Sequence, residues 1–195
     1  MIIKENLIFR YDNVIDKHYC DNIFNYYKNN HNNNLNDTTK LPWFEGNILY
    51  WDFLKNTKIK NEISECRDTI TNLVKKSFNV DVFPNTTTLV MWKKGKSMSI
   101  HKDNAYENDK RLLHMRKYST VMYINDDFEG GETVILKENS NEIEYVSKPQ
   151  TGSVLIFRSD ESCLHGVKKI EKGERLTLAM WFATEEKYLE NGKIS

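Results

Sequence analysis

Two histidines and an aspartate are the side chains in this sequence best suited to binding a metal ion. His101 and Asp103 stand two residues apart in MSIHKDN, and side chains at this spacing point to the same face of a β-strand. They would offer an imidazole nitrogen and a carboxylate oxygen to one point, or else lie on a solvated strand. An isolated His-x-Asp triplet arises often by chance, so the rest of the chain has to decide.

His165 is the second histidine of interest. It follows the apolar run SVLIF and a short turn, where the chain starts another strand. This is a usual place for a ligand at the mouth of a β-barrel, although His165 alone could equally be a hydrogen-bonded structural histidine. Two histidines and one carboxylate leave open positions on a metal, and this ligand set suits nonhaem Fe(II) oxygen chemistry. His101, Asp103 and His165 would supply it.

Arg175 lies ten residues further on, in GERLTLAMW. Strand alternation places Arg175 and Thr177 on the face opposite Leu176 and Leu178, so this face either meets solvent or holds an anion inside a barrel. A planar guanidinium matches a carboxylate with two parallel hydrogen bonds, and a nearby hydroxyl can complete the site. Together with the histidines, a dicarboxylate cosubstrate is the economical explanation.

The elements that must position these side chains change in type along the chain. Apolar residues at helical spacing predict helices over 14–28 and 58–78, with an Asn-rich loop at 29–39 between them. From residue 86 onward, six short apolar or alternating runs are separated by turn signals. They are TTTLVMW, YSTVMYI, ETVIL, IEYVS, SVLIF and RLTLAMWF. The sequence predicts an α+β fold in one domain over 1–195, with mainly helical support in 1–85 and a β-sandwich or jelly-roll core in 86–183.

Composition gives no sign of nucleic-acid or membrane binding. The 28 basic residues balance 28 acidic ones, so no overall field draws in a polyanion. No stretch approaches the roughly 20 apolar residues of a membrane span, and the N-terminus lacks the apolar run of a signal peptide. Cys20, Cys66 and Cys163 lie far apart, which suits reduced thiols. We therefore expect a cytoplasmic protein.

Three stretches resemble the Fe(II)- and 2-oxoglutarate-dependent dioxygenases. They are HKDN, RKYSTVMYINDDFEGGE and LHGVKKIEKGERLTLAMWF, between about residues 100 and 183. Within that superfamily they most resemble the prolyl 3-hydroxylase (leprecan) catalytic domain and, more distantly, the prolyl 4-hydroxylases. The resemblance implies a double-stranded β-helix core behind N-terminal supporting helices. It also implies Fe(II) and 2-oxoglutarate as cofactor and cosubstrate, with ascorbate as a further candidate.

Carried over residue by residue, the resemblance implies that His101, Asp103 and His165 bind iron. It further implies that Arg175 holds the distal carboxylate of 2-oxoglutarate, helped by Thr177 and Tyr123. Tyr123 shares a strand face with two residues of STVMYI, so its hydroxyl can reach the interior, although core packing is the alternative.

Four aromatic or turn features carry further expectations. Prolyl 4-hydroxylases usually have a tyrosine nine residues before the first histidine, where this chain has Trp92, so the pocket is expected to differ in shape. Trp181 is expected either to wall the pocket or to join the core. NDDFEGGE lacks the spacing of a calcium loop, and its two glycines fit a turn. The aromatic residues of LPWFEGNILYWDF could line a peptide groove or pack the helices onto the sheet.

The implied activity is hydroxylation of peptidyl proline, coupled to oxidation of 2-oxoglutarate to succinate. The expected partner is a proline-containing peptide or protein, with no nucleic acid and no membrane. A free amino acid or another small molecule is an alternative substrate, since one metal site serves many substrates. A silent jelly roll that binds peptide or metal is a rival of another class. The sequence leaves open the oligomeric state and the carbon that is hydroxylated.

Overall fold

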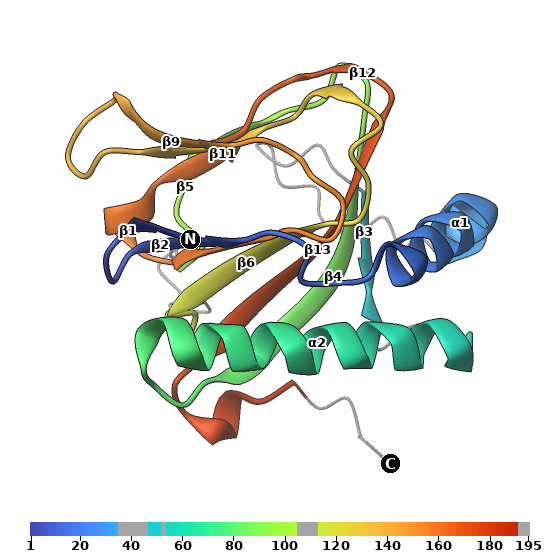
Figure 1. The fold of residues 1–195 in the computed structure, drawn as a ribbon, viewed down its shortest axis with the longest axis horizontal. Coiled ribbons are helices and arrows are strands. Elements are labelled where there is room, and N and C mark those ends of the chain that lie inside the picture. Colours follow the sequence, from blue (N-terminus) through green and yellow to red (C-terminus); the bar gives the residue numbers. More distant parts are fainter. Residues whose placement is uncertain (35–46, 52–53, 105–112, 191–195) are drawn as a thin grey trace.

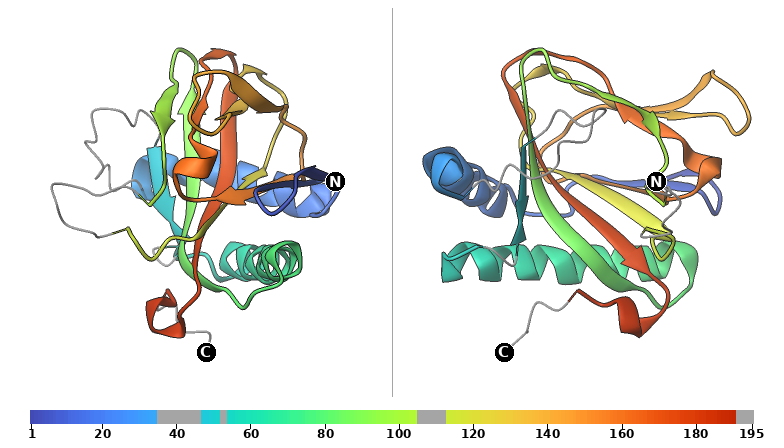
Figure 2. Two further views of the ribbon diagram at one scale, coloured as in Figure 1. Left: turned by 90° about the vertical axis from the view of Figure 1, so that its left-hand side faces the viewer. Right: turned by 180° about the vertical axis from the view of Figure 1, so that it is seen from behind.

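Two β-sheets face each other, and two helices cover the outer face of the larger sheet (Figure 1). The computed structural model describes residues 1–34, 47–51, 54–104 and 113–190, and the side chains of 30–34 and 47 are outside this description. Both views in Figure 2 show the smaller sheet on one side of the larger sheet and helix α2 on the other. This is the predicted jelly-roll architecture, but the sheets do not close into a barrel.

The larger sheet has seven strands and the smaller has four, all paired antiparallel. In spatial order the larger sheet contains β1 (Ile2–Lys4), β2 (Ile8–Tyr11), β10 (Val154–Arg158), β6 (Tyr118–Tyr123), β13 (Glu174–Ala183), β4 (Phe83–Lys93) and β3 (Asn47–Tyr50). The smaller contains β5 (Met98–His101), β11 (His165–Val167), β8 (Thr133–Leu136) and β9 (Ile143–Ser147). The other described elements are a two-stranded ribbon, two helices and two 3-10 turns. The ribbon consists of β7 (Glu129–Gly130) and β12 (Ile170–Lys172), the helices are α1 (Lys17–Asn34) and α2 (Thr57–Phe78), and the turns are η2 (Glu161–Cys163) and η3 (Glu186–Tyr188).

Strand β13 shows how side-chain alternation separates the core from the site. Leu176 and Leu178 point toward the helices and join the main apolar cluster. Arg175 and Thr177 therefore point the other way, into the space between the sheets, as strand geometry requires. Both are almost completely buried, so the solvent-facing alternative for this face of the strand is excluded.

Helix α2 matches the predicted helix, whereas the prediction for α1 was wrong at both ends. The Asn56 side chain caps α2 by accepting from the Ile59 amide, and Asn79 ends it in the left-handed conformation. The first helix was expected over 14–28, followed by a loop, but α1 continues through the Asn-rich segment to Asn34. Asparagine costs at most about 0.7 kcal/mol relative to alanine within a helix, and elongation adds a hydrogen bond per residue.

Strands β1, β2 and β3 come from the segment expected to be mainly helical, and the sequence analysis did not predict them. β2 pairs with β10, and β3 pairs with β4, so the N-terminal third supplies both borders of the larger sheet. Each is only three or four residues long, which is too short for alternation to distinguish it from a loop.

Several smaller expectations can be compared with the structure. Cys20, Cys66 and Cys163 are free and buried, as expected, and burial raises the pKa of the first two to about 11 and about 12. Trp51 packs in the helix-side core with the Arg67 guanidinium 3.9 Å from its ring centre, which favours the packing role for this residue. Trp43 and Phe44 of the same aromatic stretch lie outside the described residues. In the described part of the chain, no helix is long and apolar enough to cross a membrane.

Replacing Ile63 with alanine should lower the free energy of unfolding by about 2–5 kcal/mol, because a fully buried side chain between α2 and the sheet would leave a cavity. Urea denaturation followed by circular dichroism measures this change. The matched control is Ile143→Ala, in which the side chain is 49% exposed, and we expect a change within about 0.5 kcal/mol. Equal effects of the two substitutions would contradict the assigned core.

Candidate metal and cosubstrate site

The smaller sheet brings His101, Asp103 and His165 together. His165 lies directly opposite His101 across the β5–β11 pairing, and Asp103 follows β5 by two residues. Nε2 of His101 lies 3.4 Å from Oδ1 of Asp103, and Nε2 of His165 lies 3.3 Å from Oδ2. One nitrogen or oxygen from each residue lies within 4.8 Å of the others, so the three side chains can share one metal ion.

Backbone carbonyls orient both imidazoles. Nδ1 of His101 lies 2.9 Å from the Ser99 carbonyl oxygen, and Nδ1 of His165 lies 3.0 Å from that of Cys163. A carbonyl only accepts, so each Nδ1 carries a hydrogen, and each Nε2 faces the Asp103 carboxylate. Rings held in this way can bind a metal through Nε2 once that nitrogen carries no proton, and the carbonyls supply the outer partner that such ligands normally have.

Asp103 is held ionised despite its burial. Burial alone would raise its pKa, but His165 and His101 beside the carboxylate bring the pKa well below its usual range. The Ser119 hydroxyl donates to Oδ2 at 2.6 Å, and the Ser159 hydroxyl lies 2.7 Å from that of Ser119. Because Ser119 gives its only hydrogen to the carboxylate, Ser159 must be the donor between the two serines. The site thus provides an oriented anionic ligand.

Arg175 is a buried charged group between the sheets, and no carboxylate among the described residues pairs with it. It is 2% exposed, and burial lowers the pKa of its guanidinium. Nη2 donates to Thr133 at 3.1 Å and Nη1 to Thr177 at 3.5 Å, while Nε has no hydrogen-bond partner within the described ranges. A buried charge normally has an opposite charge beside it. The arrangement therefore fits a ligand that brings its own carboxylate, as 2-oxoglutarate does.

Tyr123 and Thr177 lie next to Arg175, as the sequence analysis expected. They are cross-strand neighbours in the β13–β6 pairing, and the Arg175 guanidinium carbon lies 5.2 Å from the Tyr123 ring centre. The Tyr123 hydroxyl is 3.0 Å from Oγ1 of Thr133 and 3.1 Å from the Ser147 carbonyl oxygen. A phenol has one hydrogen for these two acceptors. The hydroxyl of Tyr123 is therefore already engaged by the protein.

Aromatic and glycine residues shape the wall around Arg175. Trp92 lies opposite Arg175 across the β13–β4 pairing and is buried in an apolar cluster on the inner face. Trp181 packs at the margin of the same cluster, so it takes part in both the core and the wall of the inter-sheet space. Gly131 has a φ of +69°, and an added Cβ would overlap Ile170 and come within 3.1 Å of Cδ of Arg175. The expected turn glycine thus also allows the close approach of the arginine stem.

The sequence analysis did not assign roles to Ser119, Thr133 or Ser147. Ser119 shares a strand face with Tyr123, which is a visible signal, but Thr133 and Ser147 reach the site only through the β8–β9 register. The other histidines lie elsewhere: His18 and His114 are exposed, with polar contacts to Asn22 and Tyr188. The side chain of His31 is outside the description.

Replacing Ser119 with alanine should weaken binding of a divalent metal about tenfold, because Asp103 loses the hydrogen bond that orients it. Calorimetric titration with Mn(II) measures the dissociation constant. Ser140→Ala, in the turn between β8 and β9, is the control and should bind metal as the wild type does. If the metal affinity of Ser119→Ala equals that of this control, then Ser119 does not orient the ligand.

Solved structures share this fold across nearly the whole chain. A Pseudomonas putida prolyl-4-hydroxylase matches with a TM-score of 0.71 and 16% identity, covering 91% of this chain and 92% of that one. A Trichoplax adhaerens prolyl hydroxylase, solved with a peptide fragment of the hypoxia inducible factor oxygen degradation domain, matches with a TM-score of 0.73. Its identity is 15%, over 94% of this chain and 86% of that chain. At these identities the likeness establishes the fold.

Sequence relatives and a family model cover the residues of the site. Human prolyl 3-hydroxylase 2 is 38% identical over 79 residues, which are 40% of this chain and 11% of the relative. Mouse prolyl 3-hydroxylase 1 is 28% identical over 110 residues, or 52% of this chain and 15% of the relative. The chain thus spans a small part of these relatives. The model of the 2OG-Fe(II) oxygenase superfamily matches residues 86–183, half of the chain, including the three clustered residues and Arg175. The chain therefore belongs to the 2OG-Fe(II) oxygenase superfamily.

Proposed function

We propose that this protein is an Fe(II)- and 2-oxoglutarate-dependent hydroxylase that acts on proline in a peptide or protein. The observation that carries the proposal is a fully buried guanidinium, Arg175, that faces the same inter-sheet space as a His-Asp-His cluster and has no internal carboxylate among the described residues. A metal site alone would fit many reactions. The added requirement for an external carboxylate fits a 2-oxo dicarboxylic acid.

Each residue has a distinct part in this proposal. His101, Asp103 and His165 hold Fe(II), and Arg175 with Thr177 binds the distal carboxylate of 2-oxoglutarate. When bound, the iron supplies oxygen chemistry: dioxygen gives one atom to succinate, formed as 2-oxoglutarate loses carbon dioxide, and the other to a substrate C–H bond. The protein orients both partners and keeps the polar groups of the site buried.

Arg116 and Trp181 support a peptide as the substrate. The Arg116 guanidinium carbon lies 4.2 Å from the Trp181 ring centre, and its Nε has no hydrogen-bond partner in the described part of the chain. Burial lowers the pKa of Arg116, while the nearby carboxylate of Asp103 acts in the opposite direction. An aromatic ring beside an N–H donor without a partner suits a proline ring and a carbonyl oxygen of its peptide bonds.

The relatives named as prolyl 3-hydroxylases and prolyl-4-hydroxylase also support proline as the residue modified. A free amino acid or another small molecule is the second candidate substrate, and it would need no more than the same metal and cosubstrate residues. We further propose a cytoplasmic location, which the three free thiols support, and no nucleic-acid or membrane partner, which the balanced charge supports.

Purified protein supplied with Fe(II), oxygen and 2-oxoglutarate should form succinate, and proline-containing peptides should increase the rate. Mass spectrometry should find one added oxygen on proline. Asp103→Ala is the control, because removal of the carboxylate leaves an incomplete ligand set and should abolish turnover. Succinate without any peptide stimulation would favour a small-molecule substrate, and no succinate above this control would contradict the proposed activity.

Replacing Arg175 with alanine should weaken 2-oxoglutarate binding by about 100-fold or more, because the cosubstrate loses a buried, charge-assisted pair of hydrogen bonds. Metal affinity should stay within about twofold, since Arg175 contacts none of the three candidate ligands. Calorimetry of the Mn(II)-loaded protein measures both constants. Arg158→Ala, which removes a partly exposed arginine paired with Asp160, should leave both constants unchanged. Unaltered 2-oxoglutarate affinity in Arg175→Ala would refute its role.

A further inference from the structure

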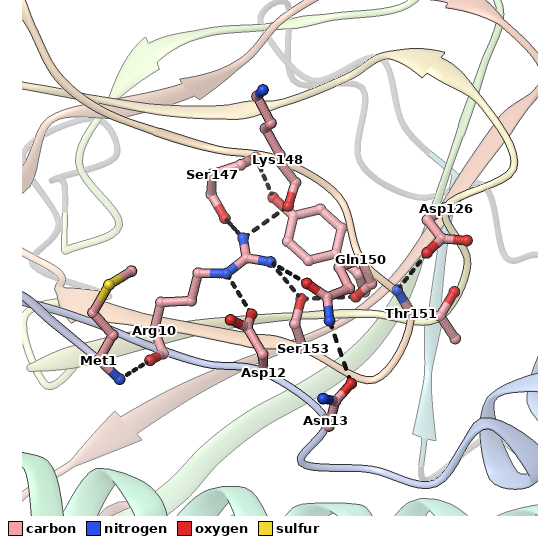
Figure 3. A network of polar contacts seen from close by, with 11 residues as sticks. Met1, Arg10, Asp12, Asn13, Asp126, Ser147, Lys148, Gln150, Thr151 and Ser153 are labelled. Carbon is pink, nitrogen blue, oxygen red and sulfur yellow. Dashed lines mark hydrogen bonds and ion pairs between the residues drawn. The ribbon is translucent and has the colours of Figure 1, made fainter.

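Arg10 is a buried arginine outside the site described so far, and it binds one short segment of the chain at several points (Figure 3). It lies on β2 on the same strand face as Ile8, which packs between the two sheets, and it is 7% exposed. Nη1 donates to Oγ of Ser147 at 2.9 Å and to the Lys148 carbonyl at 2.7 Å. Nη2 donates to Oγ of Ser153 at 3.3 Å and to Oε1 of Gln150 at 3.4 Å.

The segment bound by Arg10 is the one that contacts Tyr123. The Ser147 carbonyl accepts from the Tyr123 hydroxyl, and the Ser153 carbonyl accepts from the Tyr123 amide at 3.0 Å. The Tyr123 carbonyl in turn accepts from the Gly152 amide at 2.9 Å. Arg10 therefore binds both ends of a segment, 147–153, that holds the backbone and the hydroxyl of Tyr123.

From Tyr123 the hydrogen bonds continue to the cosubstrate residues. The Tyr123 hydroxyl meets Thr133, which is the cross-strand neighbour of Ser147, and Thr133 accepts from Nη2 of Arg175. An unbroken line of contacts thus joins Arg10, Ser147, Tyr123, Thr133 and Arg175. The line alternates between the sheets: Arg10, Tyr123 and Arg175 lie on strands of the larger sheet, and Ser147 and Thr133 lie on strands of the smaller sheet.

The charge of Arg10 is already balanced, so Arg10 is not itself a site for an anionic ligand. Nε donates to Oδ1 of Asp12 at 2.7 Å, and the remaining nitrogens donate to neutral acceptors of the segment. A planar guanidinium fixes several acceptors at once in one geometry, which a lysine ammonium on a flexible stem does less well. Its effect on the site must therefore pass through the segment that it holds.

We propose that Arg10 is a positioning residue for the cosubstrate pocket: by fixing Ser147 it sets the hydroxyls of Tyr123 and Thr133, which hold Arg175 ready for the distal carboxylate. This inference rests on the role proposed above for Arg175. Under this proposal, a residue of the N-terminal strand β2 affects the affinity for 2-oxoglutarate. A contact that only joined the two sheets would leave this affinity unchanged.

The test compares Arg10→Met with Arg67→Met, in calorimetric titrations of Mn(II) and then 2-oxoglutarate. Arg67 is a matched control because it is also buried and hydrogen-bonded, but it joins α2 to Thr87 and Glu190 on the helix side of the larger sheet. We expect Arg10→Met to raise the dissociation constant of 2-oxoglutarate about tenfold, with metal affinity unchanged. Arg67→Met should lower stability without altering either constant, and Arg10→Lys should recover part of the affinity.

A double-mutant cycle shows whether the effect passes through Tyr123. Tyr123→Phe removes the hydroxyl that meets Ser147 and Thr133, so adding Arg10→Met should then change 2-oxoglutarate affinity little. If Arg10→Met proves too unstable, Arg10→Lys enters the cycle in its place. Wild-type affinity in the Arg10 variants, or an undiminished tenfold effect in the Tyr123→Phe background, would overturn the inference. Wild-type protein that binds no 2-oxoglutarate would overturn the proposed cosubstrate role of Arg175 as well.

Discussion

The buried guanidinium of Arg175 is the constraint around which the inter-sheet space is organised. A charge inside a protein is costly unless an opposite charge or several hydrogen bonds accompany it, and here the described chain supplies only neutral partners. Thr133, Thr177 and the ring of Tyr123 hold the group without neutralising it. The arrangement makes sense for a site whose anion arrives with the ligand.

The two sheets divide the chemistry between them. The smaller sheet presents the candidate metal-binding cluster, in which the register places His101 opposite His165, while the larger sheet presents Arg175 and Thr177. Packing, hydrogen bonds and the short connections between the sheets fix the spacing of these two groups. The helices stabilise the larger sheet from outside, through the alternate side chains of the same strand that carries Arg175. The positions of the candidate metal and cosubstrate residues therefore depend on the whole sandwich.

The residues of the candidate site could be identified from the sequence, since they depend on residue type and short spacing. His101 and Asp103 share a strand face, and alternation correctly placed Arg175 opposite Leu176. Three kinds of information were absent from these patterns. Thr133 and Ser147 reach the site through strand register, which no local pattern specifies. The short strands β1, β2 and β3 have too few residues for periodicity, so the N-terminal contribution of Arg10 was also missed. The Asn-rich end of α1 shows that a weak propensity does not end an established helix.

The most direct test of the central claim compares two ligands that differ only at the end facing Arg175. Both 2-oxoglutarate and 2-oxovalerate carry the same 2-oxo acid group, but only the former has a distal carboxylate. Calorimetry with the Mn(II)-loaded protein should show that 2-oxoglutarate binds about 100-fold more tightly or better, because only its carboxylate pairs with the buried guanidinium. Equal affinity for the two ligands would contradict the account. It would mean that the buried guanidinium of Arg175 does not pair with the distal carboxylate of 2-oxoglutarate.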